Sequence, residues 1–270
     1  MRPRHLLPPV QLAWLNEMGA DTHWLAAQEP PESRRPVPQR TVAQPPESRR
    51  PVPQPPVPQL RRADRAPLAP PADLPSLATA DLDALGQAVG ICTRCPLHAQ
   101  RTQAVPGAGV RVRPLYFIVG EQPGIEDDAS GQPFQGDSGN LLRVMMAAAR
   151  LPEAESVYLT NIVKCRVVGG RAPSAEEIAA CLPYLHREIA LVQPRWILAL
   201  GKTAAQAILG VSDDLDVLRG GPHAWTGPDG TAIPVWVTHH PSSLLVRSAG
   251  KPEAWRDLAA LAQAVQAAQD

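Results

Sequence analysis

Residues 174–200 read SAEEIAACLPYLHREIALVQPRWILAL, a helical pattern followed directly by a strand pattern. Ser174 and Glu177 have the spacing of a capping box, in which each side chain binds the other residue's backbone N–H, so a helix is expected to begin here. Pro183 lacks an amide hydrogen and is expected to end this helix and start a second one. The run Trp196–Leu200 is short and wholly apolar, which is typical of a strand buried on both faces.

The same alternation of helix and strand recurs on both sides of this stretch. Three further apolar runs predict buried strands, at Leu115–Val119, Val157–Leu159 and Val235–Val237. Helices are expected at 138–149, at 252–267 and, from an N-cap at Thr79, up to Gly90. Strands that alternate with helices form a parallel sheet with both faces covered. We therefore expect an α/β fold, a three-layer α/β/α sandwich with a central, mostly parallel four-stranded sheet.

Proline divides the chain into three parts. Of the 32 prolines, 14 lie between Pro30 and Pro71, and such a segment cannot form enough backbone hydrogen bonds or bury enough apolar surface to fold. We expect a disordered linker at 29–75 and one globular domain at 76–270. A short helical segment is expected within 1–28, where it either packs on this chain's own core or recruits a partner protein.

Charge and hydropathy exclude several classes of protein. The 26 Lys and Arg balance the 26 Asp and Glu, and residues 1–71 hold 10 of the basic and 6 of the acidic residues. The rest of the chain is therefore slightly acidic, so if it bound DNA, the affinity would have to come from a local basic patch or from single-strand pockets and not from a global positive field. No apolar run is long enough to span a membrane and no secretory signal pattern is present, so a cytoplasmic location is expected. The protein is also expected to be a monomer.

The four cysteines predict a metal centre. They form a Cys92-x2-Cys95 pair and a Cys165-x15-Cys181 pair, and four buried free thiols would not explain the first of these. Cytoplasmic cysteines in such a set are expected to bind metal. A zinc ribbon needs two CxxC pairs, whereas an iron–sulfur cluster needs only four converging thiolates, so the spacing favours a 4Fe-4S cluster over zinc. Because all four cysteines are used as ligands, we expect a structural role that joins the first helix to the unit at 157–181.

Polar or glycine-rich motifs follow three of the predicted strands. In sheets of this class ligands bind at the carboxyl ends of strands, which is where these motifs lie. The motifs are GEQPG at 120–124 with GQPFQG at 131–136 and SGNLL at 138–142, TNIVKC at 160–165, and HHPSSLL at 239–245. Together with CTRCPL at 92–97 they resemble a family 4 uracil-DNA glycosylase over about residues 80–265.

The resemblance implies an enzyme that flips uracil out of DNA and hydrolyses its N-glycosidic bond, which starts base excision repair. Phe134 would stack on the base, and the amide of Asn161 would pair with uracil O4 and N3–H. His240 would donate a hydrogen bond to O2 as negative charge develops there, and Glu121 would orient the attacking water or stabilise the sugar cation. Plainer interpretations are a loop anchor for Phe134, a turn-forming asparagine for Asn161 and a carboxylate bonded to loop amides for Glu121.

Further residues complete the expected site. Gly120, Gln122, Pro123 and Gly124 would line the base pocket. Ser138, Lys164, Ser242, Ser243 and Arg247 would contact DNA phosphates, with Lys202 and Lys251 as further candidates. Leu244 would wedge into the space left by the flipped base, unless it belongs to the core. No lysine of these motifs is placed as an amine nucleophile, so a monofunctional glycosylase is expected.

One departure from the family pattern and one competing motif bear on the mechanism. Family 4 members usually carry a small residue where Gln122 stands, and glutamine there is similar to relatives that trap uracil through a histidine in an inserted segment. The corresponding segment, 166–173, has no histidine, so trapping is not expected. Gly201-Lys-Thr203 is similar to the end of a phosphate-binding P-loop, but Trp196 stands where that motif needs glycine, which excludes it.

Two other functions compete with the glycosylase. One is a catalytically silent iron–sulfur DNA-binding module tethered to a repair or replication complex, and the other is a structural zinc protein. A glycosylase requires that Glu121, Asn161 and His240 converge around Phe134, to form a pocket for one base.

Overall fold

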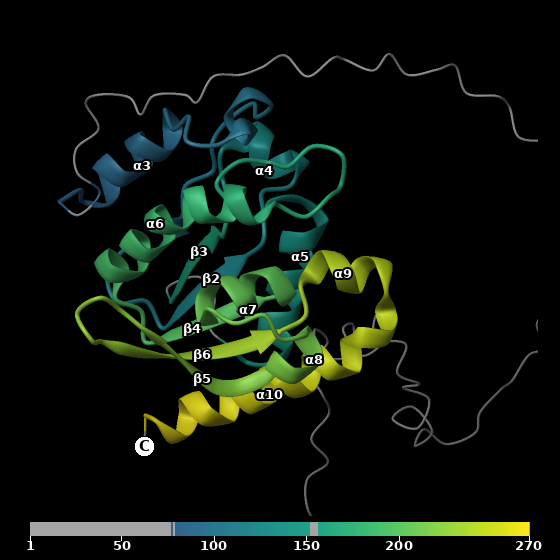
Figure 1. Ribbon diagram of the computed structural model, residues 1–270. Helices are drawn as coiled ribbons and strands as arrows, with labels where there is room; N and C mark the ends of the chain where they lie inside the picture. The colour runs from purple at the N-terminus through teal and green to yellow at the C-terminus, as the bar shows by residue number, and fades with distance from the viewer. Residues whose placement is uncertain (1–76, 78, 152–155, 270) are drawn as a thin grey trace, which may run out of the picture. The chain divides into compact units, whose positions relative to one another are not determined.

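The computed structural model describes residues 77, 79–151 and 156–269, and its centre is a six-stranded sheet (Figure 1). Four parallel strands form the middle of the sheet, in the order β3 (Val157–Asn161), β2 (Tyr116–Gly120), β4 (Trp196–Leu200) and β6 (Ala232–Thr238). These are the four strands that the apolar runs predict. Because all four point the same way, their carboxyl ends lie along one edge of the sheet.

Two additional strands form the outer edges of the sheet. Strand β1 (Ala108–Gly109) pairs antiparallel with β3, and β5 (Gly220–Thr226) pairs antiparallel with β6. Neither carries the continuous apolar run of a strand buried on both faces, since β1 has two residues and most of β5 is exposed or half-buried. The prediction of a mostly parallel α/β sheet is therefore confirmed, but the predicted number of strands is too small.

Helices cover both faces of the sheet (Figure 1). The helices are α3 (Leu82–Gly90), α4 (Ile125–Ser130), α5 (Gly136–Ala148), α6 (Ala175–Val192), α7 (Lys202–Leu209), α8 (Leu215–Leu218), α9 (Pro241–Val246) and α10 (Lys251–Ala267), with 3-10 turns η1 (Pro96–Ala99) and η2 (Ser248–Gly250). Alternate strand residues face opposite layers. Phe117 and Val119 pack in the core with α3, α6 and α7. Tyr116 and Ile118 pack in the core with α5 and α10.

The structure corrects two predicted helix boundaries. Helix α6 continues through Pro183 instead of ending there, because residues on both sides of the proline, Cys181 and Tyr184, are buried in one core with the sheet. Tertiary packing outweighs the hydrogen bond that the proline cannot donate. The first helix begins two residues later than predicted: its N-cap is Asp81, whose Oδ1 accepts the N–H of Ala84 at 2.8 Å, and not Thr79.

The expected helical segment at 1–28 and the expected linker at 29–75 lie outside the described residues. Within the described ranges, no helix combines the length and the apolar character that crossing a membrane requires.

Candidate active site

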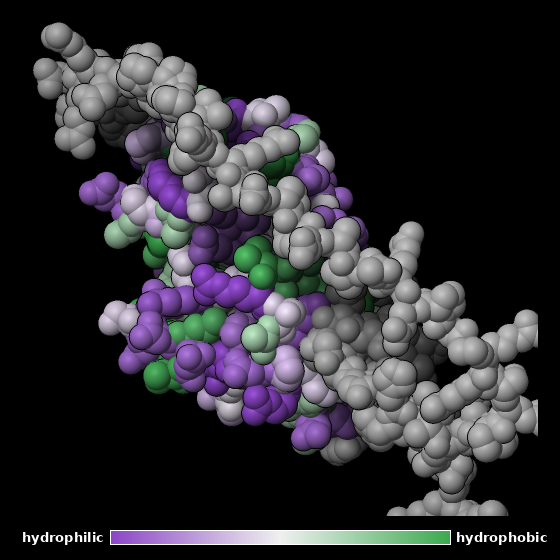
Figure 2. Space-filling model, turned by 90° about the vertical axis from the view of Figure 1, so that its right-hand side faces the viewer, coloured by the Kyte–Doolittle hydropathy of each residue, from purple (hydrophilic) through white to green (hydrophobic). Residues whose placement is uncertain are grey.

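A cavity of about 810 Å³ lies at the carboxyl ends of the parallel strands. Its walls come from the loop after β2, the end of β3, Gly201 after β4 and the turn after β6. Figure 2 looks onto the side of the molecule where β6 ends, and there hydrophobic residues lie among hydrophilic ones. Segments far apart in the sequence thus meet at the edge where the motifs predict a ligand site.

Gly120, the last residue of β2, lies where three side chains of the cavity wall meet. A Cβ atom added there would lie 2.5 Å from Asn161 Oδ1, 2.8 Å from Phe134 Cζ and 3.2 Å from His240 Nε2. All three separations are shorter than ordinary contacts or at their lower limit, so only glycine fits. We call the part of the cavity where these side chains meet the Gly120 recess. It brings together three of the side chains that the sequence places in the pocket.

Two hydrogen-bond donors in the Gly120 recess have no acceptor among the described residues. They are Asn161 Nδ2 and His240 Nε2, and both atoms are inaccessible to solvent. A buried polar group without a partner costs about 1–3 kcal/mol, so native proteins rarely keep one without a functional reason. Two such atoms beside one recess indicate a site shaped for a ligand that carries acceptors.

The surroundings of His240 fix both its tautomer and its charge. His240 is the N-cap of α9, and its Nδ1 accepts the backbone N–H of Ser242 at 3.2 Å. Because an amide nitrogen can only donate, Nδ1 carries no hydrogen and the ring proton is on Nε2. Burial lowers the pKa of His240 from 6.5 to about 4. At neutral pH the ring is therefore an uncharged donor whose Nε2–H belongs to the Gly120 recess.

Glu121 lines the cavity and is held by a residue that the sequence interpretation missed. Its Oε2 accepts the hydroxyl hydrogen of Thr203 at 2.6 Å, and its Oε1 lies 3.4 Å from Gln122 Nε2. Thr203 is in the first turn of α7, within the Gly201–Thr203 stretch that resembles a P-loop. That stretch positions a carboxylate. Its place directly after a buried strand is the signal that could have identified it.

Phe134 occupies a strained backbone conformation beside the recess. Its φ angle is 57°, in the left-handed region that bulky residues seldom adopt, and its side chain is buried. A Cβ on Gly139 would lie 1.7 Å from the Phe134 carbonyl oxygen, so this turn requires glycine in the first part of α5. Its ring centroid lies 6.2 Å from that of His240, at an interplanar angle of 25°. Strain of this kind concentrates at functional sites.

Asp127 joins the loop after β2 to the loop that carries Phe134. Its carboxylate accepts the N–H of Gly124 at 3.1 Å and the N–H of Gln135 at 2.7 Å. Burial raises the pKa of Asp127, although these amide hydrogen bonds oppose that shift. Sequence reasoning did not select this residue. It connects the two loops that bound the cavity on this side.

Gln122 makes contacts that explain its departure from the family pattern. Its Oε1 accepts the N–H of Val167 at 3.2 Å, and its Nε2 donates to the carbonyl of Arg171 at 3.1 Å. The side chain therefore fastens the short segment 166–173 to the loop after β2. A small residue at this position could not make either bond.

The two adjacent histidines point in different directions. His239 Nε2 lies 3.0 Å from Glu253 Oε2, an oxygen that also accepts from Arg219 Nη1 at 2.7 Å. The Nε of Arg219 in turn pairs with Asp257 Oδ2 at 3.0 Å. His239 thus belongs to an ionic network between β6, α8 and α10, whereas His240 faces the Gly120 recess.

Of the three lysines expected to contact phosphates, two are buried, and the third, Lys202, is half exposed and lines the cavity. Lys164 is 2% exposed and forms an ion pair with Glu188 at 2.6 Å, so it cannot reach DNA and the prediction is wrong. It was mistaken for a surface lysine because its partner lies 24 residues along the chain. Lys202 pairs with Asp214, and Lys251 is buried. The other phosphate candidates, Ser138, Ser242, Ser243 and Arg247, line the cavity.

The expected wedge, Leu244, is part of the core. It is 1% exposed and packs among residues of α5 and α10, because α9 is a helix and its period turns this residue inward. Leu245 and Val246, the next residues, are 49% and 83% exposed. The apolar side chains that this turn presents to solvent are therefore these two.

The four cysteines lie in or against the core that the sheet forms with α3, α6 and α7, and we call them the cysteine group. Cys165 and Cys181 are buried there, and Cys92 and Cys95 pack against it half-buried. Burial raises the pKa of Cys95, of Cys165 and, to about 12, of Cys181. In the described part of the chain no three side chains are close enough to hold a single metal ion.

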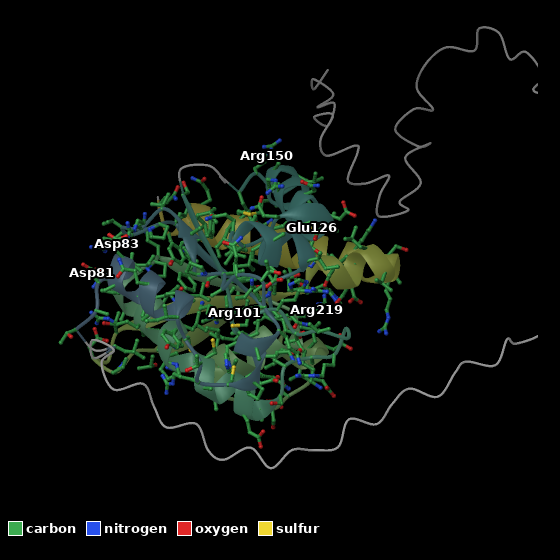
Figure 3. All side chains as sticks on the ribbon, turned by 90° about the horizontal axis from the view of Figure 1, so that it is seen from above. Asp81, Asp83, Arg101, Glu126, Arg150 and Arg219 are labelled. Carbon is green, nitrogen blue, oxygen red and sulfur yellow. The ribbon has the colours of Figure 1, made fainter. Side chains whose placement is uncertain are left out.

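The donor set of the cysteine group fits an iron–sulfur cluster. All four donors are sulfur, and a cube of four irons and four sulfides separates its thiolates more widely than a single ion does. Arg101 Nη1 donates to Cys165 Sγ at 3.0 Å, and Figure 3 shows Arg101 beside sulfur atoms. The N–H of Lys164 donates to Cys181 Sγ at 3.3 Å. Such N–H···S contacts are typical of cluster surroundings.

Comparison with known proteins agrees with this geometry. The family model of the uracil DNA glycosylase superfamily matches residues 106–259, more than half of the chain. A type-4 uracil-DNA glycosylase of Pyrobaculum aerophilum is 36% identical over 184 residues, which cover 66% of this chain and 92% of the relative. The type-4 enzyme of Thermotoga maritima is 39% identical over 165 residues, covering 61% and 83%. The chain therefore belongs to the uracil DNA glycosylase superfamily and, within it, to the type-4 family.

Proposed function

We propose that this protein excises uracil from DNA by hydrolysing its N-glycosidic bond, which leaves an abasic site and starts base excision repair. The observation that carries the proposal is the Gly120 recess, where an aromatic ring and two unpartnered buried donors meet. The relatives are named as uracil-DNA glycosylases, which supports the same reaction here. A module that only binds DNA would not need these two donors, because each buried donor without an acceptor costs about 1–3 kcal/mol.

Recognition of the base rests on Phe134 and Asn161. The Phe134 ring supplies a flat apolar surface on which a flipped base stacks. The Asn161 amide donates from Nδ2 to uracil O4 and accepts the uracil N3–H at Oδ1. Cytosine carries an amino group and an unprotonated N3 at those positions, so it would oppose donor to donor and acceptor to acceptor. The amide thereby selects uracil over cytosine.

Bond cleavage rests on His240 and Glu121. Breaking the glycosidic bond leaves negative charge on uracil O2 and positive charge on the sugar. The Nε2–H of His240 donates to O2 as that charge develops, and a neutral ring is sufficient because the interaction strengthens only in the transition state. The carboxylate of Glu121, held by Thr203, orients the attacking water or stabilises the sugar cation. None of these groups is an amine nucleophile, so the strand is not cut.

DNA contact outside the recess rests on the turn after β6. Ser242, Ser243 and Arg247 line the cavity mouth and bind phosphates, with Ser138 on the opposite loop. The exposed side chains of Leu245 and Val246 fill the space left by the flipped base, in place of Leu244.

The cysteine group would hold a 4Fe-4S cluster. With four thiolate ligands such a cluster has no open iron site, so it supplies rigidity and takes no part in hydrolysis. It joins the end of α3, the turn after β3 and the middle of α6, where its ligands lie. This places a rigid unit directly beside Asn161, which ends β3.

The decisive experiment is incubation of the purified protein with an end-labelled oligonucleotide that contains one uracil, followed by alkali to cleave abasic sites. Cleavage should appear only after alkali, and only at uracil. Oligonucleotides with cytosine or thymine at the same position are the substrate controls. Asn161→Ala is the matched protein control and should lose at least about 100-fold in rate, the equivalent of a few kcal/mol of hydrogen bonding. Retention of the oligonucleotide without base release would instead indicate the silent binding module.

A further inference from the structure

A buried ion pair lies directly behind the Gly120 recess. Lys164 and Glu188 are each 2% exposed, and Lys164 Nζ lies 2.6 Å from Glu188 Oε2. The same Nζ donates to the backbone carbonyl of Asn161 at 2.9 Å and to the hydroxyl of Thr160. The three N–H groups of the ammonium are thereby matched by three acceptors, two of which belong to the end of β3.

The carboxylate of Glu188 accepts further hydrogen bonds through both of its oxygens. Glu188 lies in α6, its Oε2 also accepts the Thr160 hydroxyl at 3.0 Å, and its Oε1 accepts the N–H of Gly107 at 3.1 Å. The pair therefore ties the last two residues of β3 to the helix above them. No atom of the pair lines the cavity.

Stability alone does not explain such a pair. Removing two charges from water costs several kcal/mol per ion, and apolar replacements of similar volume are often neutral or stabilising. What the pair does fix is the backbone at the point where β3 ends, because Asn161 is the last strand residue and its carbonyl is bonded to Lys164. The position of that backbone sets where the Asn161 amide lies in the recess.

We propose that the Lys164–Glu188 pair positions Asn161 for reading the base, an inference that rests on the proposed function. Neither residue touches the base, and both act through the Asn161 backbone. The N–H of Lys164 also donates to Cys181 Sγ, and Cys165 is its neighbour in the chain. One residue therefore contacts both the cysteine group and the backbone of the base-reading side chain.

The first measurement tests whether the pair holds the segment. The variant is Lys164→Met/Glu188→Leu, which replaces both charges with apolar groups and leaves neither one buried alone. The probes are the amides of Ile162 and Val163, which donate to the carbonyls of Gly120 and Glu121 at 2.9 and 3.2 Å. Their hydrogen exchange should quicken at least about 10-fold. Exchange equal to wild type would overturn the proposal, whether or not the protein excises uracil.

The second measurement tests whether the pair acts through Asn161. Replacing the pair in the wild-type protein should slow single-turnover uracil excision roughly 10- to 100-fold, as a small misplacement of a binding group does. In an Asn161→Ala background the same replacement should change the rate less than about 2-fold, because the side chain that it positions is gone. Equal losses in both backgrounds would show a general structural effect and reject the inference.

Three controls distinguish this inference from the loss of any ion pair, from a failure to fold and from a failure of the proposed function. Arg111→Met removes the exposed ion pair with Asp83, neither of which lines the cavity, and should leave both amides and the rate near wild type. Glu188→Gln keeps the volume and an acceptor oxygen while it removes the charge, and replaces the double variant if that protein does not fold. A wild-type protein inactive on uracil would contradict the proposed function, while the exchange measurement would still decide whether the pair holds β3.

Discussion

The hydroxyl of Thr203 donates a 2.6 Å hydrogen bond to Oε2 of Glu121, across the carboxyl ends of the neighbouring strands β4 and β2. A carboxylate that lines a cavity can rotate about its side-chain bonds unless a fixed donor holds one oxygen. Thr203 is fixed because it lies in the first turn of α7. The second oxygen, Oε1, has a longer contact of 3.4 Å with Gln122 Nε2, so Thr203 is the closer of the two donors that hold this carboxylate.

Thr203→Val should therefore lower the single-turnover rate of uracil excision about 10-fold, with little change in affinity for uracil-containing DNA. Valine keeps the shape of threonine and removes only the donor, and a hydrogen bond to a charged group contributes about 1.5–3 kcal/mol. Thr203→Ser restores the donor and should recover most of the rate. The idea fails if the serine and valine variants are equally slow.

His240→Ala should lower the single-turnover rate by about 100-fold, the equivalent of roughly 3 kcal/mol, while the Kd for uracil-containing DNA stays nearly unchanged. The lost donor acts on charge that exists only in the transition state. His239→Ala is the control, because that side chain bonds to Glu253 and is expected to affect stability more than rate. A larger loss of rate for His239→Ala would mean that the two histidines have exchanged roles.

The ionisation of His240 gives a prediction in pH. Its folded-state pKa is about 4 against an ordinary value of 6.5, because burial disfavours the charged ring. The unfolded chain thus takes up this proton first as pH falls. His240 therefore leaves the free energy of unfolding at its full value above about pH 6.5, and that free energy falls as pH falls from there to about 4.

Two measurements check this prediction. Imidazole NMR should show His240 neutral, with its hydrogen on Nε2, down to about pH 5. The free energy of unfolding, measured with urea, should fall less steeply over the same interval in His240→Gln. A titration of the His240 ring near pH 6.5 would contradict the buried site described above.

From the cysteine group we predict the metal content of the purified protein. Protein purified without oxygen should be brown and contain about four irons per chain. Cys181→Ala should lose iron and soluble yield together, since this residue is buried within α6. A colourless preparation that contains zinc would show that the cluster assignment is wrong.

The sequence was sufficient for the parts of the fold that depend on local pattern. Each parallel strand is a continuous apolar run, and each motif follows such a run, so the edge that carries the site could be predicted. Strand β5 could not, because its sequence GGPHAWT has no such run and it forms by pairing with β6. Pro183 was misread because a local rule about proline was outweighed by burial on both sides of it.

The side chains of the site divide in the same way. The alternation of His239 and His240 follows from an extended backbone and could be predicted. Leu244 could not, because it depends on α9 being helical. Lys164 and Thr203 are bonded to Glu188 and Glu121, which are 24 and 82 residues away in the chain. Such pairings arise only when the strands and helices are assembled, so composition and spacing do not reveal which residues become partners.

The close packing around Gly120 also limits which substitutions this enzyme can accept during evolution. Every other amino acid adds at least one carbon there, and that carbon would lie within 3.2 Å of Asn161, Phe134 and His240. A single substitution would therefore block the recess and leave the turn after β6 intact. Evolution can adjust which base is accepted only through the residues around this position. An altered Gly120 would instead give a descendant that occupies damaged DNA without repairing it.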